Sequence, residues 1–371
     1  MNIQQQFNQS LAFYQQGKLQ QARSGYEAII RVYPRHAEAL HMLGVVYAQL
    51  GEPVLALNSL DKAVMLLPNR ADIHLNRGNA LQVLNRLEDA LNSFSQSILL
   101  NAKSPNAHFN KGNVLHKLDR LAEALDSYSQ AILLKEDHPE FYYNRGNIFQ
   151  LLGQHESAVS DYFQALRFDP KHLGAYFNCG NVLQTLGRFE DAIVFYDRAI
   201  SVRSDCADAY GNRGNAFYAL RKYEDAIASY DLANSFNPNL AEVHYNRGLV
   251  LQVMCRFEEA LQSFNKLKEI NLSYPYFLGI SSYTRRRISD WSFFDEETKE
   301  LKSQIHQGYH VALPFFSVVL LESPLLHLMA AKTFALDKYA VSNLLGPILR
   351  HKDRQKIRIG YFSADFHNHA T

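Results

Sequence analysis

The sequence has 371 residues, of which 47% are hydrophobic and 20% are charged. This length predicts more than one structural unit, and the apolar content excludes an intrinsically disordered chain. The 38 basic and 37 acidic side chains leave a formal net charge of +1, which argues against nucleic acid or an anionic membrane as a partner.

The start of the chain and its cysteines indicate a cytoplasmic protein. Residues 1–17 lack the basic stretch followed by an apolar run that a secretory signal peptide has. The three cysteines have neither an even count nor C-x-x-C spacing, so we expect reduced thiols. The most apolar segment, residues 311–331, is interrupted by Pro314, Glu322 and Pro324, which predicts a buried helical hairpin and no membrane span.

Between about residues 3 and 274 the sequence repeats with a period of 34 residues. The phrase Asn-Arg-Gly-Asn at 144–147 recurs with small changes at 76–79, 110–113, 178–181, 212–215 and 246–249. An alanine follows each of these glycines after 12 residues, and a bulky side chain, most often Tyr or Phe, follows after 16. Two antiparallel helices can cross closely only where side chains are small, so we expect glycine and alanine at each crossing with the ring beside them. The spacing therefore predicts eight helical hairpins.

The residues between the paired helices agree with this interpretation. Gly51, Gly153 and Gly187, with Asn85 and Asp119 at equivalent positions, suit the left-handed residue that ends a helix. The pattern resembles the tetratricopeptide repeat. The resemblance implies an all-α superhelix over residues 3–274, in which stacked hairpins share one core and the first helices line a concave wall.

One column of asparagines is expected to face away from the helix crossing. Asparagine costs roughly 0.5 kcal/mol relative to alanine within a helix, so a column of eleven suggests a use. A primary amide can pair with both the N–H and the C=O of an extended main chain. We therefore predict that proteins or extended peptides bind in a groove lined by Asn76, Asn79, Asn110, Asn113, Asn144, Asn147, Asn178, Asn181, Asn212, Asn215 and Asn246.

The alternative for this column is structural: the amides contact water or one another between neighbouring repeats. His74, His108 and His244 share a position with tyrosines, so we expect them to fill the helix crossing, and we expect no metal site.

Beyond the repeats, residues 275–350 are predicted to form a helical connector. Helices are expected near 276–283, 294–305, 315–321 and 325–336, and the run Arg285-Arg286-Arg287 is expected to be a solvated surface. Residues 356–363 alternate and then become apolar, which predicts a β-strand that begins an α/β lobe over 356–371.

The last residues carry a second resemblance. Residues 357–371, Ile-Arg-Ile-Gly-Tyr-Phe-Ser-Ala-Asp-Phe-His-Asn-His-Ala-Thr, follow a repeat array and Asp290-Trp291. This arrangement resembles the start of the catalytic region in SPINDLY-like bacterial protein O-GlcNAc transferases, whose repeats also carry asparagine columns. The resemblance implies transfer of a sugar to Ser or Thr of proteins, from a UDP donor, UDP-GlcNAc, in the O-GlcNAc transferases. Because plant proteins of related architecture transfer fucose, the sugar stays open between GlcNAc and fucose. His369 matches the active-site histidine of that family, with an acid/base or acceptor-placing role.

Because the chain ends at Thr371, before most of such a catalytic region, we expect no bound cofactor and no catalysis by this polypeptide. We also find no glycine-rich phosphate loop and no paired carboxylates with catalytic spacing. Two interpretations remain: the substrate-recognition arm of a protein O-GlcNAc transferase-like enzyme, or a tetratricopeptide adaptor without chemistry of its own.

Overall fold

The computed structural model describes residues 2–271 and 274–338, and within these ranges the chain is entirely helical, with twenty α-helices and no strand. The strand predicted at 356–363 and His369 lie outside the described residues. The chain divides into two compact units, residues 1–256 and 257–371. No described helix has both the length and the apolar character that a membrane span requires.

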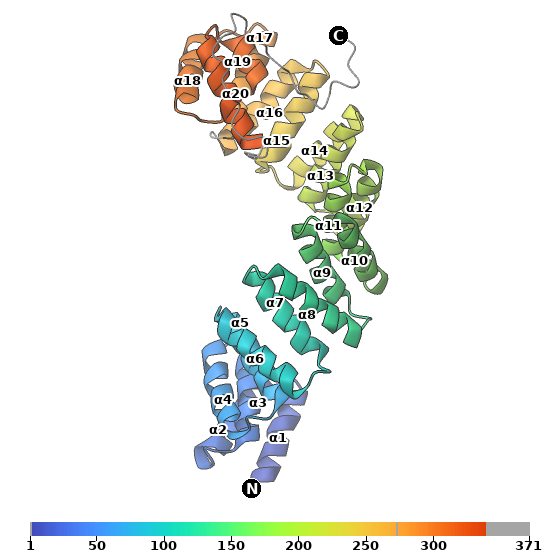
Figure 1. Ribbon diagram of the computed structural model, residues 1–371, viewed down its shortest axis with the longest axis vertical. Helices are drawn as coiled ribbons and strands as arrows, with labels where there is room; N and C mark the ends of the chain where they lie inside the picture. The colour runs from blue at the N-terminus through green and yellow to red at the C-terminus, as the bar shows by residue number, and fades with distance from the viewer. Residues whose placement is uncertain (1, 272–273, 339–371) are drawn as a thin grey trace, which may run out of the picture. The chain divides into compact units, whose positions relative to one another are not determined.

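The first unit contains hairpins of a constant size, stacked in chain order (Figure 1). Each first helix has 13 residues and each second helix has 14. In order they are α1 Ile3–Gln15, α2 Leu19–Val32, α3 Ala37–Gln49, α4 Pro53–Leu66, α5 Ala71–Val83, α6 Leu87–Leu100, α7 Pro105–Lys117, α8 Leu121–Leu134, α9 Pro139–Leu151, α10 His155–Phe168, α11 Leu173–Thr185, α12 Phe189–Val202, α13 Ala207–Ala219, α14 Tyr223–Phe236 and α15 Ala241–Val253.

The predicted turn residues have the expected backbone. Positive φ angles of 56° to 77° occur at Gly51, Asn85, Asp119, Gly153 and Gly187. Only glycine adopts this region without strain, and Asn and Asp tolerate it better than other residues. The prediction that left-handed residues end these first helices is therefore confirmed.

Close helix crossings explain the glycine and aromatic columns. A Cβ atom built on Gly146 would lie 2.8 Å from Cε1 of Tyr162, and one on Gly112 would lie 2.7 Å from Cε1 of Tyr128. Both tyrosines are fully buried. In the hairpins from α5/α6 to α13/α14 the ring of the second helix thus occupies the space that a side chain on the first helix would need, whereas in α1/α2 the first helix carries Ser10 and the glycine, Gly25, lies on the second helix.

Successive first helices also touch one another: contacts join α3 to α5, α5 to α7, α7 to α9, α9 to α11, α11 to α13 and α13 to α15. The surface that these seven helices line is called the first-helix face below. It is the part of the unit on which the asparagine column lies.

The second unit contains five described helices: α16 Phe257–Ile270, α17 Phe277–Arg287, α18 Phe294–His306, α19 Pro314–Leu320 and α20 Pro324–Lys338. Its small core includes Leu301, Ile305, Val311, Leu320 and Leu326. The helix positions agree with those predicted from the sequence.

The expectation that the arginine run is solvated is wrong for two of its three members. The Arg285 side chain is 13% exposed and forms ion pairs with Asp290 at 2.9 Å and Glu297 at 3.1 Å. The Arg286 guanidinium lies 4.5 Å from the centre of the Phe294 ring and donates to the Leu320 carbonyl. These cations hold helices together because α18 supplies a carboxylate and a ring opposite α17, which the local sequence pattern does not reveal.

Candidate functional site

The asparagines form a hydrogen-bonded ladder across successive repeats. All eleven are half-buried on the first-helix face. In four junctions, Nδ2 of the first asparagine of one repeat donates to Oδ1 of the second asparagine of the preceding repeat. These bonds are Asn110 to Asn79 at 2.8 Å, Asn178 to Asn147 at 2.9 Å, Asn212 to Asn181 at 2.9 Å and Asn246 to Asn215 at 3.0 Å.

In four repeats a buried tyrosine binds the second asparagine. The hydroxyls of four tyrosines donate to Oδ1 of the asparagine on the facing first helix: Tyr128 to Asn113, Tyr162 to Asn147 and Tyr196 to Asn181 at 2.8 Å, and Tyr230 to Asn215 at 2.7 Å. Burial raises the pKa of each of these tyrosines well above its usual value, so the hydroxyl keeps its proton and remains a donor. The aromatic column therefore orients the amide ladder as well as filling the core.

Two junctions depart from this pattern. Asn76 donates Nδ2 to Nε2 of His41 at 2.8 Å. The preceding repeat has no asparagine at the equivalent position that could accept this bond. Asn144 has no side-chain hydrogen bond among the described residues, and Oδ1 of Asn113 accepts only from Tyr128. The ladder is thus interrupted between α7 and α9.

The bonds within the ladder leave a regular set of groups free. Where Nδ2 of Asn178 and Oδ1 of Asn147 bind each other, Oδ1 of Asn178 and Nδ2 of Asn147 have no partner among the described residues. Neither atom is one of the buried polar atoms that lack a hydrogen bond, so both are in reach of solvent. Each junction of this kind presents one acceptor and a pair of N–H donors from two neighbouring helices.

The other predicted residues have simpler surroundings. Nε2 of His74 lies 2.8 Å from the Pro68 carbonyl, Nε2 of His108 lies 3.1 Å from the Ala102 carbonyl, and Nε2 of His244 lies 2.9 Å from the Pro238 carbonyl. These histidines join a first helix to the loop before it. His369, the one predicted catalytic residue, is outside the described residues.

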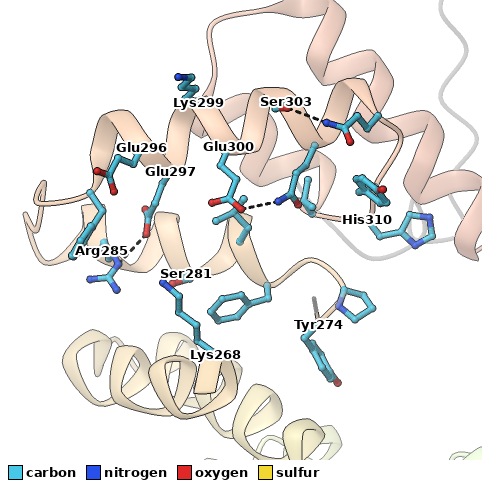
Figure 2. A pocket seen from close by; sticks show the side chains of 18 of the residues that line it. Lys268, Tyr274, Ser281, Arg285, Glu296, Glu297, Lys299, Glu300, Ser303 and His310 are labelled. Carbon is cyan, nitrogen blue, oxygen red and sulfur yellow. Dashed lines mark hydrogen bonds and ion pairs between the residues drawn. The ribbon is translucent and has the colours of Figure 1, made fainter. Parts of the chain in front are cut away.

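A second candidate, missed by the sequence analysis, is a cavity of about 1120 Å³ within residues 257–338. It lies among α16, α17 and α18. Figure 2 shows Glu297 and Glu300 of α18 directed toward α17, Lys268 of α16 directed toward Ser281, and Lys299 directed away. Arg285 pairs with Glu297, and Gln304 Nε2 donates to Glu300 at 2.8 Å, so several polar groups of the lining already have partners within it. Its mixture of charges selects no class of ligand, and no repeat or motif in the sequence marks it.

Comparison with known proteins supports the repeat assignment. Profiles described as TPR repeat match residues 112–153 and 214–254, and profiles described as tetratricopeptide repeat match residues 7–72, 139–172 and 173–206. No curated protein matches the chain.

Solved structures of tetratricopeptide repeat proteins are among those similar to this chain. YrrB, described as a TPR protein with an unusual peptide-binding site, is 23% identical; the match covers 50% of this chain and 95% of YrrB with a TM-score of 0.46. MamA is 24% identical, with 44% of this chain and 95% of MamA covered and a TM-score of 0.42. A repeat protein from Parabacteroides merdae is 19% identical, with 67% and 98% covered and a TM-score of 0.48.

Proposed function

We propose that this chain, which contains tetratricopeptide repeats, binds extended peptide segments of other proteins on its first-helix face. The observation that carries the proposal is the free acceptor and the free donor at each junction where two asparagines of neighbouring repeats are hydrogen-bonded, as at Asn147 and Asn178. An extended main chain offers the complementary N–H and C=O groups at regular intervals along its length.

Recognition of this kind would depend little on the peptide's side chains. The free amide atoms match groups that every residue except proline carries. Because a satisfied neutral hydrogen bond contributes only about 1 kcal/mol net, several junctions must act together. After the cost of ordering the peptide, we expect dissociation constants on the order of micromolar.

The ladder is also held in place before a ligand arrives. Asn147, Asn181 and Asn215 each accept both a tyrosine hydroxyl and the next asparagine. A side chain that is already fixed loses less conformational freedom on binding. This favours binding over a purely solvated polar surface.

A finer proposal is that the first-helix face is the protein-recognition arm of a cytoplasmic protein O-GlcNAc transferase-like enzyme. It rests on the resemblance of residues 357–371, with His369, and of Asp290-Trp291 to that family. In that setting the face would deliver Ser or Thr side chains of proteins to a UDP-sugar-dependent centre. The alternative is an adaptor that joins proteins without chemistry, which uses the same face.

The direct test is titration of the purified chain with fluorescein-labelled, unstructured Ser/Thr-rich peptides of about 15 residues, followed by fluorescence anisotropy. We expect saturable binding that weakens at least about tenfold when Asn144, Asn178 and Asn212 are all replaced with alanine. Replacement of three exposed residues on second helices, Lys62, Asn58 and Gln130, is the matched control. Unchanged binding in the folded triple variant would contradict the proposal.

A parallel titration with UDP-GlcNAc tests the expectation that this chain holds no donor site. Binding of the nucleotide sugar to this chain would favour the transferase interpretation and would place a donor site within these residues. Peptide binding alone is the result expected of a recognition arm or an adaptor.

A further inference from the structure

The residue just before the first asparagine of each repeat lies near the junction with the following first helix. In α7 and α9 this position is aromatic: the Phe109 ring lies 4.8 Å from that of Phe141, and the Tyr143 ring lies 4.5 Å from that of His172. Phe177 of α11 packs beside Cys206 at the next junction. At each of these places the ring fills the space against the start of the following first helix.

In α13 the same position is Gly211, and Val243 of α15 packs against it: a Cβ atom built on Gly211 would lie 3.1 Å from Cγ2 of Val243. A hollow of about 60 Å³ remains there, between Gly211 on one side and Leu240 and Val243 on the other. Three asparagines of the ladder, Asn212, Asn215 and Asn246, also line it. The hollow is far smaller than the roughly 300 Å³ or more of small-molecule sites, so it fits one side chain of a longer ligand.

Two carboxylates, Asp208 and Glu242, border the hollow. Both residues are exposed, and neither forms an ion pair among the described residues. At the equivalent position of other repeats, Arg70 bonds to Asp72, and Nε2 of His172 lies 3.3 Å from Glu140, a pair that becomes ionic only when the imidazole is protonated. Arg203 is close enough to Asp208 to interact with it electrostatically, but among the described residues no cation forms a direct ion pair with either carboxylate.

We propose that this hollow is a subsite for a lysine or arginine side chain of a peptide bound on the asparagine ladder. This inference rests on the proposed peptide-binding function and adds a preference to it. The aliphatic stem of the side chain would cover Leu240 and Val243, and its charged end would meet Asp208 and Glu242. The surrounding amides hold the main chain of the same peptide, so the basic side chain also sets its register.

The test compares labelled 15-residue peptides of Ser, Thr, Gly and Ala that carry one central lysine, arginine, norleucine or glutamate. Norleucine keeps the stem and removes the charge. We expect the lysine or arginine peptide to bind about fivefold more tightly than the norleucine peptide at low ionic strength, with the difference shrinking in 0.5 M salt. In the Asp208→Asn/Glu242→Gln variant the difference should fall below about twofold.

The matched control is Asp72→Asn/Glu140→Gln, which removes two carboxylates at the same position of other repeats that do not border the hollow, and it should keep the full preference. A Gly211→Phe variant, checked for native helix content by circular dichroism, should lose the preference, because its side chain would crowd Val243 and occupy the hollow. Equal binding of the lysine and norleucine peptides to the unmodified chain would overturn the subsite. So would a preference that survives in Asp208→Asn/Glu242→Gln. If none of the peptides binds, the peptide-binding function itself fails, which is a distinguishable result.

Discussion

Replacing Asn178 and Asn144 separately with alanine should change stability in opposite directions. Nδ2 of Asn178 donates to Oδ1 of Asn147 at 2.9 Å and to the Tyr143 hydroxyl at 3.2 Å, whereas the Asn144 side chain makes no hydrogen bond among the described residues. Both positions are half-buried within a first helix and both lie two residues before a crossing glycine. The pair therefore isolates the contribution of the ladder bonds.

The magnitude follows from two terms. Loss of two neutral hydrogen bonds costs about 2 kcal/mol, because each contributes about 1 kcal/mol net. Replacing asparagine with alanine in a helix returns about 0.5 kcal/mol. Asn178→Ala should therefore lower the free energy of unfolding by about 1.5 kcal/mol, and Asn144→Ala should raise it by about 0.5 kcal/mol.

The assay is urea denaturation followed by circular dichroism at 222 nm, with the first loss of signal compared between variants because repeat arrays do not always unfold in one step. Peptide binding is measured on the same samples and should weaken in both variants, since both lose a free amide group from the first-helix face. Equal stability changes in the two variants would refute the inference that the hydrogen bonds of the ladder stabilise the contact between neighbouring repeats.

Two further predictions concern charged groups. Arg145→Ala should destabilise the chain by about 3 kcal/mol, because Arg145 forms two hydrogen bonds with the carboxylate of Asp161, whose side chain is 6% exposed. The double variant Arg145→Ala/Asp161→Asn should recover much of this loss, because it removes the unpaired buried charge. Thermal unfolding measures both effects. Burial lowers the pKa of His41, which accepts from Asn76, so the unfolded chain takes up the proton more readily. The stability due to neutral His41 should be complete above about pH 6.5 and should decline as the pH falls below it. His41→Gln should therefore show a smaller loss of stability between about pH 7.5 and 5.5 than the unmodified chain. The same pH profile in both proteins would contradict this prediction.

The repeat architecture could be predicted from the sequence because its causes lie within one hairpin. The spacing from Gly146 to Tyr162 sets a crossing that recurs every 34 residues, and Gly153 marks the turn between the same two helices. Periodicity detects such constraints directly. It also located α17 to α20, whose apolar segments are bounded by proline or polar residues.

The ladder geometry could not be predicted in the same way. Asn178 and Asn147 are 31 residues apart in different repeats, and which end of each amide is used depends on where the Tyr162 hydroxyl lies. From the sequence, ligand binding and mutual contact of the asparagines are alternatives. At the four junctions with an asparagine–asparagine bond, the contact uses one end of each amide, and the proposed peptide contact needs only the other end. The hollow at Gly211 was also missed, although the replacement of a ring by glycine in one repeat is a signal that the sequence contains.

The hydrogen bonds of the ladder also explain why asparagine suits this column better than other polar residues. Glutamine carries the same amide on a longer stem and would lose more rotamer freedom when fixed. Aspartate lacks the N–H that Asn178 donates to Asn147, and a row of carboxylates at this spacing would repel. A short amide can serve at both positions: the second asparagine accepts from a tyrosine of its own hairpin and from the next repeat, and the first donates to the preceding repeat. Each then keeps its other end free. The helix propensity lost at most of the eleven positions is thereby offset by bonds between repeats, and these free ends are oriented before any peptide is bound.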